Sequence, residues 1–136
     1  MIDFELSPEI ARNRDMIHML AESQMRPLSR EYDEREHEKP MEFFEMMWNA
    51  SKMSPVEFGG GRSAKKDGPS TRSLGSAVTI EELSWGDAGL YLSIPNPGLG
   101  GAAVMAAGTP EQKERFLARF KNGAPKWGAM AITEPG

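Results

Sequence analysis

The chain has 136 residues, of which 39% are apolar and 26% are charged, and its formal net charge is −4. This length suits one modest core, and the absence of cysteine excludes disulfides and thiol chemistry. Well-mixed, slightly acidic charge excludes the basic field of a nucleic-acid-binding protein. Because no stretch reaches the roughly 20 apolar residues of a membrane span and Met1 to Leu6 lacks the pattern of a signal peptide, we expect a soluble, cytoplasmic protein.

The first predicted element is a helix that begins at Ser7-Pro8-Glu9. A hydroxyl cap, a proline in the first turn and an acid at the positive end of the helix dipole favour a helix start. The apolar residues that follow recur at helical spacing: Ile10, Ile17, Leu20, Ala21 and Leu28. Pro27 is expected to end this helix near Arg26.

A charged stretch without apolar periodicity, from Ser29 to Lys39, separates this helix from the next. Pro40 opens the second predicted helix, which ends near Lys52. One face of it carries Phe44, Met47, Trp48 and Ser51. Glycine and polar residues from Gly59 to Ser73 then predict a loop.

The next predicted helix runs from Leu74 to about Trp85, and Asp87 is expected to cap a following helix through Leu90, Tyr91 and Ile94. Pro95 and Pro97 interrupt that run. Asn96 is expected to cap a short helix that reaches Gly108.

The clearest local signal in the sequence is Thr109-Pro110-Glu111-Gln112. It combines an N-cap, a proline at the first helical position and a capping-box glutamine. Phe116, Leu117 and Phe120 supply the apolar face of this helix, and Asn122-Gly123 closes it.

A single strand is predicted from Lys126 to Thr133, where residues alternate with a period of two. A lone strand leaves its backbone donors and acceptors unpaired. We therefore expect its neighbouring strands to lie in another chain or in sequence that is absent here, so that the chain is a truncated piece.

Four segments in a fixed order carry a family resemblance. They are Pro55-Val56-Glu57-Phe58-Gly59-Gly60, then Glu81-Glu82-Leu83 before the Asp87 helix, then Gly108-Thr109-Pro110-Glu111-Gln112-Lys113, and last Gly128-Ala129-Met130-Ala131-Ile132-Thr133-Glu134-Pro135-Gly136. The chain resembles the N-terminal helical domain of acyl-CoA dehydrogenases. The resemblance implies an all-α covered part, an orthogonal helical bundle over residues 1–125, and over 126–136 the first strand of a missing middle β-domain.

The resemblance also implies a function. The members of the family are FAD-dependent oxidoreductases of fatty acid and lipid metabolism that remove hydrogen from an acyl-CoA substrate. They are usually homotetramers, and they pass electrons to an electron-transferring flavoprotein. Their catalytic base lies in the C-terminal domain, so no catalytic residue is expected in this chain, and Glu134 is not that base. An acyl-CoA oxidase or flavin monooxygenase of the same fold, and a non-catalytic partner subunit, stay open as alternatives.

Two sets of site residues follow from the resemblance. Met130, Ala131, Ile132 and Thr133 are expected to face the pyrimidine side of the flavin, where fixed N–H and O–H donors stabilise its reduced form. In many relatives an aromatic residue stands where this chain has Met130. Tyr91, Leu92, Pro95 and Leu99 are expected to line the acyl pocket. The alternatives are that Thr133 only ends a strand before a turn and that Leu92 and Leu99 are core residues.

Three further features are weighed against simpler explanations. Gly98 to Ala103 matches the spacing of a dinucleotide-binding loop, but that motif requires a preceding strand, so the glycines are expected to permit close helix packing. His18 and His37 lack ligand partners at metal-binding spacing, and no metal is expected. Loop 59–73 is basic, through Arg62, Lys65, Lys66 and Arg72, and is either a surface insertion or an electrostatic attractor for a CoA phosphate.

Overall fold

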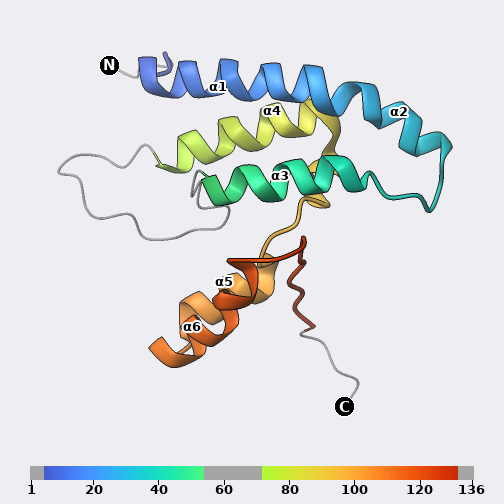
Figure 1. The fold of residues 1–136 in the computed structure, drawn as a ribbon. Helices are drawn as coiled ribbons and strands as arrows, with labels where there is room; N and C mark the ends of the chain where they lie inside the picture. The colour runs from blue at the N-terminus through green and yellow to red at the C-terminus, as the bar shows by residue number, and fades with distance from the viewer. Residues whose placement is uncertain (1–4, 54–71, 132–136) are drawn as a thin grey trace. The chain divides into compact units, whose positions relative to one another are not determined.

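The computed structural model describes residues 5–53 and 72–131, and every regular element in these ranges is helical, as predicted for the covered part of the chain (Figure 1). The chain divides into two compact units, which are taken in turn below. One comprises Met1–Pro40 and Lys65–Ser93, and the other Met41–Ala64 and Ile94–Gly136. Within the described ranges, no helix combines the length and the apolar character that crossing a membrane requires.

The first unit begins with α1 (Pro8–Leu20), a π-helical turn (Ala21–Met25) and α2 (Arg26–Glu34). The Ser7 hydroxyl accepts the N–H of Ile10 at 3.3 Å, which confirms the predicted helix start. The prediction that Pro27 ends this helix is wrong. In the wider π-helical turn the Arg26 N–H bonds to the Ala21 carbonyl five residues back, so Pro27 falls in the first turn of α2, where its missing N–H costs nothing.

Helix α2 then continues through the charged stretch for which no apolar periodicity was found. Its surface carries ion pairs one helical turn apart, Arg30 with Glu34 at 2.8 Å and Arg35 with Glu31 at 3.0 Å. Each such pair adds roughly 0.2–0.5 kcal/mol to helix stability. Helix α2 has no buried residue of its own, so it is held by its junction with α1, by surface charges and by polar contacts with α4, none of which apolar periodicity can reveal.

Helix α4 (Arg72–Leu92) packs along α1 and the π-helical turn (Figure 1). The buried apolar residues of this unit lie on these elements: Ile10, Ala21, Met25, Val78, Leu83 and Leu90. Polar bridges join α1 to α4 beside this core. The Asn13 amide donates to the Thr79 hydroxyl at 3.3 Å, and His18 Nδ1 lies 2.6 Å from Glu82 Oε2.

A break inside α4 falls at Asp87, whose backbone is extended (φ −173°, ψ 117°). Its Oδ1 accepts the N–H of Leu90 at 2.7 Å, so the predicted N-cap is confirmed. Its Oδ2 accepts the Ser29 hydroxyl of α2 at 2.5 Å. One carboxylate therefore starts the last turns of α4 and also joins them to α2.

The second unit begins with α3 (Met41–Met53), which buries the predicted Phe44, Met47 and Trp48, and also Phe43. The Trp48 indole N–H donates to the Gly123 carbonyl at 2.8 Å. Gly123 has a positive φ of 83°, a conformation in which glycine carries no steric cost. Asn122-Gly123 was predicted to close the C-terminal helical segment, and the turn lies there. The bond from Trp48 joins α3 to this turn.

Helices α5 (Gly98–Ala107) and α6 (Pro110–Leu117), the latter extended by a 3₁₀ turn (Ala118–Phe120), complete the second unit. The predicted capping box at Thr109 is present, whereas the N-cap residue of α5 is Pro97, not Asn96, and it makes no side-chain cap hydrogen bond. Asn96 lies one residue before the N-cap. The Asn96 side-chain oxygen accepts the N–H of Gly98 at 2.6 Å. The capping box closes in both directions, because Thr109 N donates to Gln112 Oε1 at 2.8 Å and Gln112 N donates to Thr109 Oγ1 at 3.3 Å.

The predicted strand is not formed over residues 126–131, which have no regular secondary structure. The physical reason is that strand geometry is stabilised by a hydrogen-bonded neighbour, and no strand occurs elsewhere in the described ranges to provide one. Ile132 and Thr133, the end of the predicted strand, lie outside the described residues. So do residues 59–71 of the predicted basic loop.

Candidate functional site

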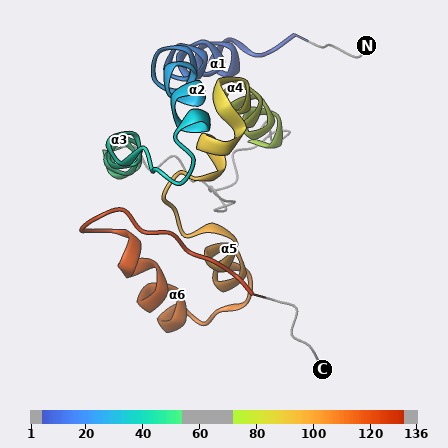
Figure 2. The same ribbon diagram turned by 90° about the vertical axis from the view of Figure 1, so that its right-hand side faces the viewer.

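The candidate site is organised by the segment that leaves the helices, Lys126 to Ala131, hereafter the exit segment. It runs across the start of α5, as Figure 2 shows. The N–H of Gly128 donates to the Asn96 carbonyl, just before α5, at 2.9 Å. A backbone hydrogen bond thus fixes the exit segment at one point on the N-terminal end of α5.

Three glycines make this crossing close enough for backbone to touch backbone. A Cβ atom at Gly98 would lie 2.5 Å from the Gly128 carbonyl oxygen, and one at Gly100 would lie 2.5 Å from the Ala129 carbonyl oxygen. A Cβ at Gly128 would lie 2.1 Å from the Pro97 carbonyl oxygen. Because real Cβ atoms do not approach other atoms below 3.0 Å, these positions accept only glycine in this geometry. We call Gly98, Gly100 and Gly128 the glycine seat.

Beyond the seat the exit segment is open. Met130 is 41% exposed, and Ala131 is exposed too. Neither residue uses its backbone in a hydrogen bond with another described residue. Their N–H and C=O groups can therefore form hydrogen bonds with a ligand or with a neighbouring strand. Backbone groups need such partners when they become buried.

The other end of the exit segment is held by aromatic contacts. Trp127 meets Phe44 of α3 edge to face, with ring centroids 5.6 Å apart. A hollow of about 470 Å³ lies between the exit segment and the C-terminal end of α6, bounded among others by Phe116, Phe120 and Trp127. Trp127 is still 49% exposed, so a large apolar side chain remains available on this surface.

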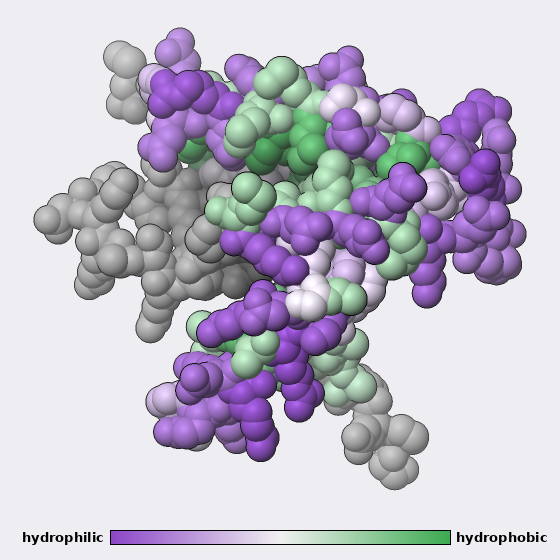
Figure 3. All heavy atoms as spheres, in the orientation of Figure 1, coloured by the Kyte–Doolittle hydropathy of each residue, from purple (hydrophilic) through white to green (hydrophobic). Residues whose placement is uncertain are grey.

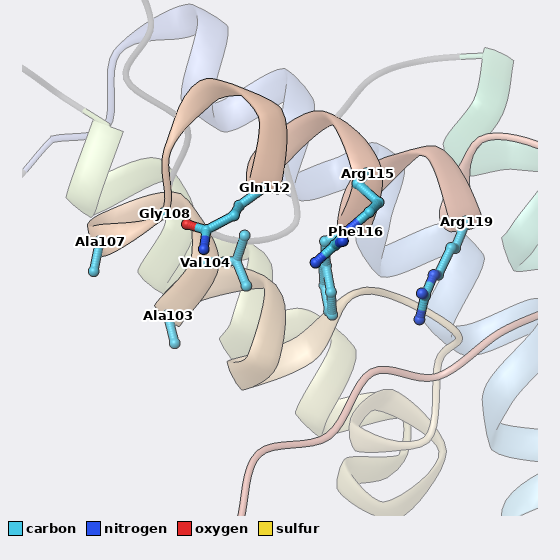
Figure 4. Close-up of a pocket in the computed structure, with 8 residues that line it drawn as sticks. All are labelled: Ala103, Val104, Ala107, Gly108, Gln112, Arg115, Phe116 and Arg119. Atoms are coloured by element: carbon cyan, nitrogen blue, oxygen red, sulfur yellow. The ribbon is translucent and has the colours of Figure 1, made fainter.

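A second hollow of about 520 Å³ lies between α5 and α6 (Figure 4). Val104 and Phe116 supply its apolar floor, and Arg115 and Arg119 project from successive turns of α6 (Figure 4). Gln112 uses its oxygen in the capping box. The side-chain polar groups left to this hollow, those of Arg115, Arg119 and the Gln112 amide nitrogen, are N–H donors, which suit an anion.

The expected acyl-pocket residues fall in different surroundings. In the first unit, Tyr91 is half-buried near the end of α4 and Leu92, its last residue, is 78% exposed. In the second unit, Pro95 is fully buried just before α5, whereas Leu99 on α5 is 68% exposed. The alternative that Leu92 and Leu99 are core residues of this chain is therefore wrong. Pro95 and Leu99 bracket Asn96 and Gly98, at the point where the exit segment crosses.

A third cluster, in the first unit, joins His18, Glu82, Trp85 and Arg26. The His18 ring stacks on Trp85 with centroids 4.3 Å apart, and the guanidinium of Arg26 lies 5.6 Å from the centre of the Trp85 ring. These are contacts of a structural kind between α1, the start of α2 and α4. In the described part of the chain no three His, Asp or Glu side chains come together in a metal-binding group.

Sequence reasoning missed the crossing at the glycine seat. It expected the glycines of α5 to permit close packing of helices, but the close neighbour of Gly98 and Gly100 is the exit segment. The sequence does contain an indication of the crossing, because Gly128 stands within the exit segment in addition to the glycines of α5. Pairing the two glycine sites requires knowledge of the tertiary path.

The fold and the site define a class of protein: an all-helical domain whose last helices guide an extended segment outward. Comparison with known proteins supports this class. Residues 7–124 match the family model described as "Acyl-CoA dehydrogenase, N-terminal domain". The chain belongs to the acyl-CoA dehydrogenase family, a family of FAD-dependent oxidoreductases.

Individual relatives agree with this assignment. The chain is 33% identical over 136 residues to a short-chain specific acyl-CoA dehydrogenase of Clostridium acetobutylicum, covering 98% of this chain and 34% of the relative. It is 36% identical over 126 residues to a 3-(aryl)acrylate reductase of Clostridium sporogenes, covering 90% and 31%. It is 29% identical over 143 residues to an acryloyl-CoA reductase (NADH) of Anaerotignum propionicum, covering 98% and 32%. The chain thus spans about one third of the length of these relatives.

Proposed function

We propose that this chain is the N-terminal helical domain, residues 1–125, and the first β-domain segment, residues 126–136, of a flavoenzyme. The reaction is α,β-dehydrogenation of an acyl-CoA thioester, with hydride passing to FAD. The observation that carries the proposal is the exit segment, which is fixed at the start of α5 by backbone contacts and then presents, at Met130 and Ala131, backbone groups that bond to no other described residue. In a flavoenzyme such groups are needed at the edge of the isoalloxazine ring.

The cofactor would be held at this edge by Met130, Ala131, Ile132 and Thr133. When bound, FAD supplies the two-electron acceptor of the reaction. The residues of this chain would contribute N–H donors, and Thr133 its hydroxyl, toward the electron-rich pyrimidine side of the ring. Met130 is half-exposed and flexible, so in place of an aromatic ring it offers an adaptable apolar contact beside the flavin.

The acyl group would lie against Tyr91, Leu92, Pro95 and Leu99. Leu92 and Leu99 support this role because large apolar side chains with such exposure gain free energy when a ligand or another domain covers them. Pro95 and Pro97 interrupt the helix before α5, which widens the choice of acyl group to bulky or branched ones. Graded acyl-CoA chains test this point, and a plain preference for straight chains would contradict it.

A second candidate function is reduction of an α,β-unsaturated acyl compound, the reverse direction of the same chemistry. The names of two relatives favour it, since one is a 3-(aryl)acrylate reductase and another an acryloyl-CoA reductase. An oxidase or monooxygenase using the same fold, and a non-catalytic partner subunit, are further alternatives. In the leading proposal the full-length enzyme is a homotetramer in the cytoplasm. It passes its electrons to an electron-transferring flavoprotein.

The deciding experiment is to express the longest reading frame that contains this chain and record its absorbance spectrum. A yellow protein with a flavin band, bleached under anaerobic conditions by a saturated acyl-CoA, supports the dehydrogenase. A reduced flavin reoxidised by an enoyl-CoA but not generated from saturated acyl-CoA favours the reductase. A colourless protein that takes up no FAD contradicts both and favours the non-catalytic subunit. Reoxidation by air, compared with an electron-transferring flavoprotein, separates the oxidase.

A further inference from the structure

The two proposed contact surfaces, for the flavin edge and for the acyl group, meet at the start of α5. Pro95 and Leu99 lie just before and just after the crossing point, and Met130 lies two residues beyond Gly128. The connection between them is made by backbone atoms, since the Gly128 N–H bonds to the Asn96 carbonyl at 2.9 Å. Backbone contacts have no rotamers, so the separation of the two surfaces has little freedom to vary.

We infer that the glycine seat, together with Asn96, is a positioning device that sets the distance between the proposed acyl-binding residues Pro95 and Leu99, at the start of α5, and the proposed flavin-contacting residues Met130 and Ala131 of the exit segment. This inference rests on the proposed function. It assigns a role to residues that contact neither flavin nor substrate.

Asn96 is itself held on several sides. Its side-chain oxygen accepts the N–H of Gly98 at 2.6 Å, and its side-chain nitrogen donates to the Ile94 carbonyl at 2.7 Å. Its own carbonyl is then aimed at Gly128. The side chain of Asn96 thus fixes the peptide that holds the exit segment.

The glycine contacts also differ in how they would respond to a methyl group. At Gly100 the obstructing atom is the backbone oxygen of Ala129, which cannot rotate away. At Gly101 the nearest atom is Cβ of the Pro97 ring, at 2.4 Å, so an alanine there would push against Pro97 and not against the exit segment. An alanine at position 100 must therefore move the exit segment itself, by roughly 1 Å if ordinary contact distances are to be restored.

Hydride transfer depends strongly on such a displacement, because a 1 Å misplacement of reacting groups lowers rates about 100-fold. In the full-length flavoprotein we expect Gly100→Ala to lower kcat by about 10- to 100-fold. Since the proposed acyl-binding residues themselves are unchanged, KM should stay within about threefold. The flavin absorbance band should shift, because the donors at the ring edge move.

A ligand-free measurement accompanies the kinetics. In the FAD-free protein, Gly100→Ala should accelerate amide hydrogen exchange at Gly128, since its hydrogen bond to Asn96 is weakened. Asn96→Ala should act in the same direction on both readouts without introducing a clash, and it decides the matter if Gly100→Ala fails to fold. Gly75→Ala in α4, where a Cβ has nothing within 4 Å, is the matched control and should leave kcat, KM and the flavin band unchanged.

The outcomes separate the two proposals. A wild-type protein without flavin overturns the proposed function. A wild-type flavoprotein in which Gly100→Ala or Asn96→Ala folds, binds FAD and keeps kcat, spectrum and Gly128 exchange unchanged overturns the positioning role alone. Equal losses in the Gly75→Ala control would also overturn it, because the effect would then not be specific to the glycine seat.

Discussion

Single polar side chains cap α1, α6 and the last part of α4, and Asp87 is the most informative of them. Its two carboxylate oxygens serve different elements, one accepting the Leu90 N–H within α4 and the other the Ser29 hydroxyl of α2. The sequence predicted the first bond from local spacing. The second joins residues 58 positions apart, and nothing in the local sequence indicates it.

Replacing Asp87 by alanine removes both bonds. Loss of an N-cap costs about 0.5–2 kcal/mol, and loss of a further hydrogen bond about 1 kcal/mol, so Asp87→Ala should lower the free energy of unfolding by about 1–3 kcal/mol. Chemical denaturation measures this change. Asp87→Asn is the control and should retain most of the stability, because asparagine caps helices about as well as aspartate. An Asp87→Asn variant as unstable as Asp87→Ala would contradict the capping role.

Glu111 offers a test of helix α6 by pH. The pKa of its carboxyl is lowered from the ordinary 4.5, first by a hydrogen bond to its own backbone N–H and then by the Thr109 side chain. A carboxyl whose pKa is depressed in the folded state stabilises the fold above its unfolded pKa, and that contribution is lost as pH falls through the folded value. In an NMR titration, the Glu111 midpoint should lie below 4.5 and should rise in Thr109→Ala. An unchanged midpoint in that variant would refute the assigned cause.

Whole helices in the first unit are placed by close approach as well as by capping. A Cβ at Gly86 of α4 would lie 2.8 Å from the Ala21 Cβ and 3.2 Å from the Met25 Cβ. Both neighbours belong to the π-helical turn, which carries α1 into α2 past Pro27. Helix α4 can therefore pack this closely against Ala21 and Met25 of the π-helical turn only because position 86 is a glycine.

Gly86→Ala and Gly75→Ala form a matched pair on this one helix. The first obstructs atoms that cannot rotate away, and overpacking of this kind costs about 1–3 kcal/mol. The second meets nothing within 4 Å and should raise the free energy of unfolding by about 0.5–1 kcal/mol, because alanine loses less backbone entropy in a helix. Thermal or urea unfolding of both variants checks the opposite signs. A destabilising effect of similar size in both would show that close packing at Gly86 is not the cause.

Taken as a whole, the described chain leaves many large apolar side chains accessible. Figure 3 shows apolar residues at the surface among hydrophilic ones. Met16 and Met19 of α1 are exposed, and so are Leu99, Met105, Trp127 and Met130 in the second unit. The chain also spans only about one third of its relatives' length. The exposed apolar side chains are consistent with the proposal that other parts of a flavoenzyme cover these surfaces.

Residues 1–136 expressed alone should therefore bind FAD weakly or not at all, because one exit segment cannot enclose a dinucleotide. Titration of the isolated chain with FAD, followed by fluorescence quenching, measures this affinity. The longest reading frame is the control and should retain FAD through gel filtration. Tight, stoichiometric FAD binding by the isolated chain would contradict the proposed division of labour between domains.

The sequence by itself determined most of the local structure: the capping box at Thr109, the caps at Ser7 and Asp87, and the buried face of α3. Each depends on residues within a few positions of one another, so spacing and side-chain chemistry suffice. It also contained the family resemblance. Family membership was confirmed, while the site residues Met130 to Thr133 and Tyr91 to Leu99 stay predictions.

Only the tertiary structure decided where Pro27 falls, whether the exit segment forms a strand, and how that segment crosses α5. Pro27 is tolerated because the π-helical turn before it shifts the hydrogen-bond pattern. Gly128 meets Asn96 and Pro97 because the chain returns after α6. These features depend on atoms that are far apart along the chain or on neighbours outside it, and a sequence pattern of short range carries no information about such distances.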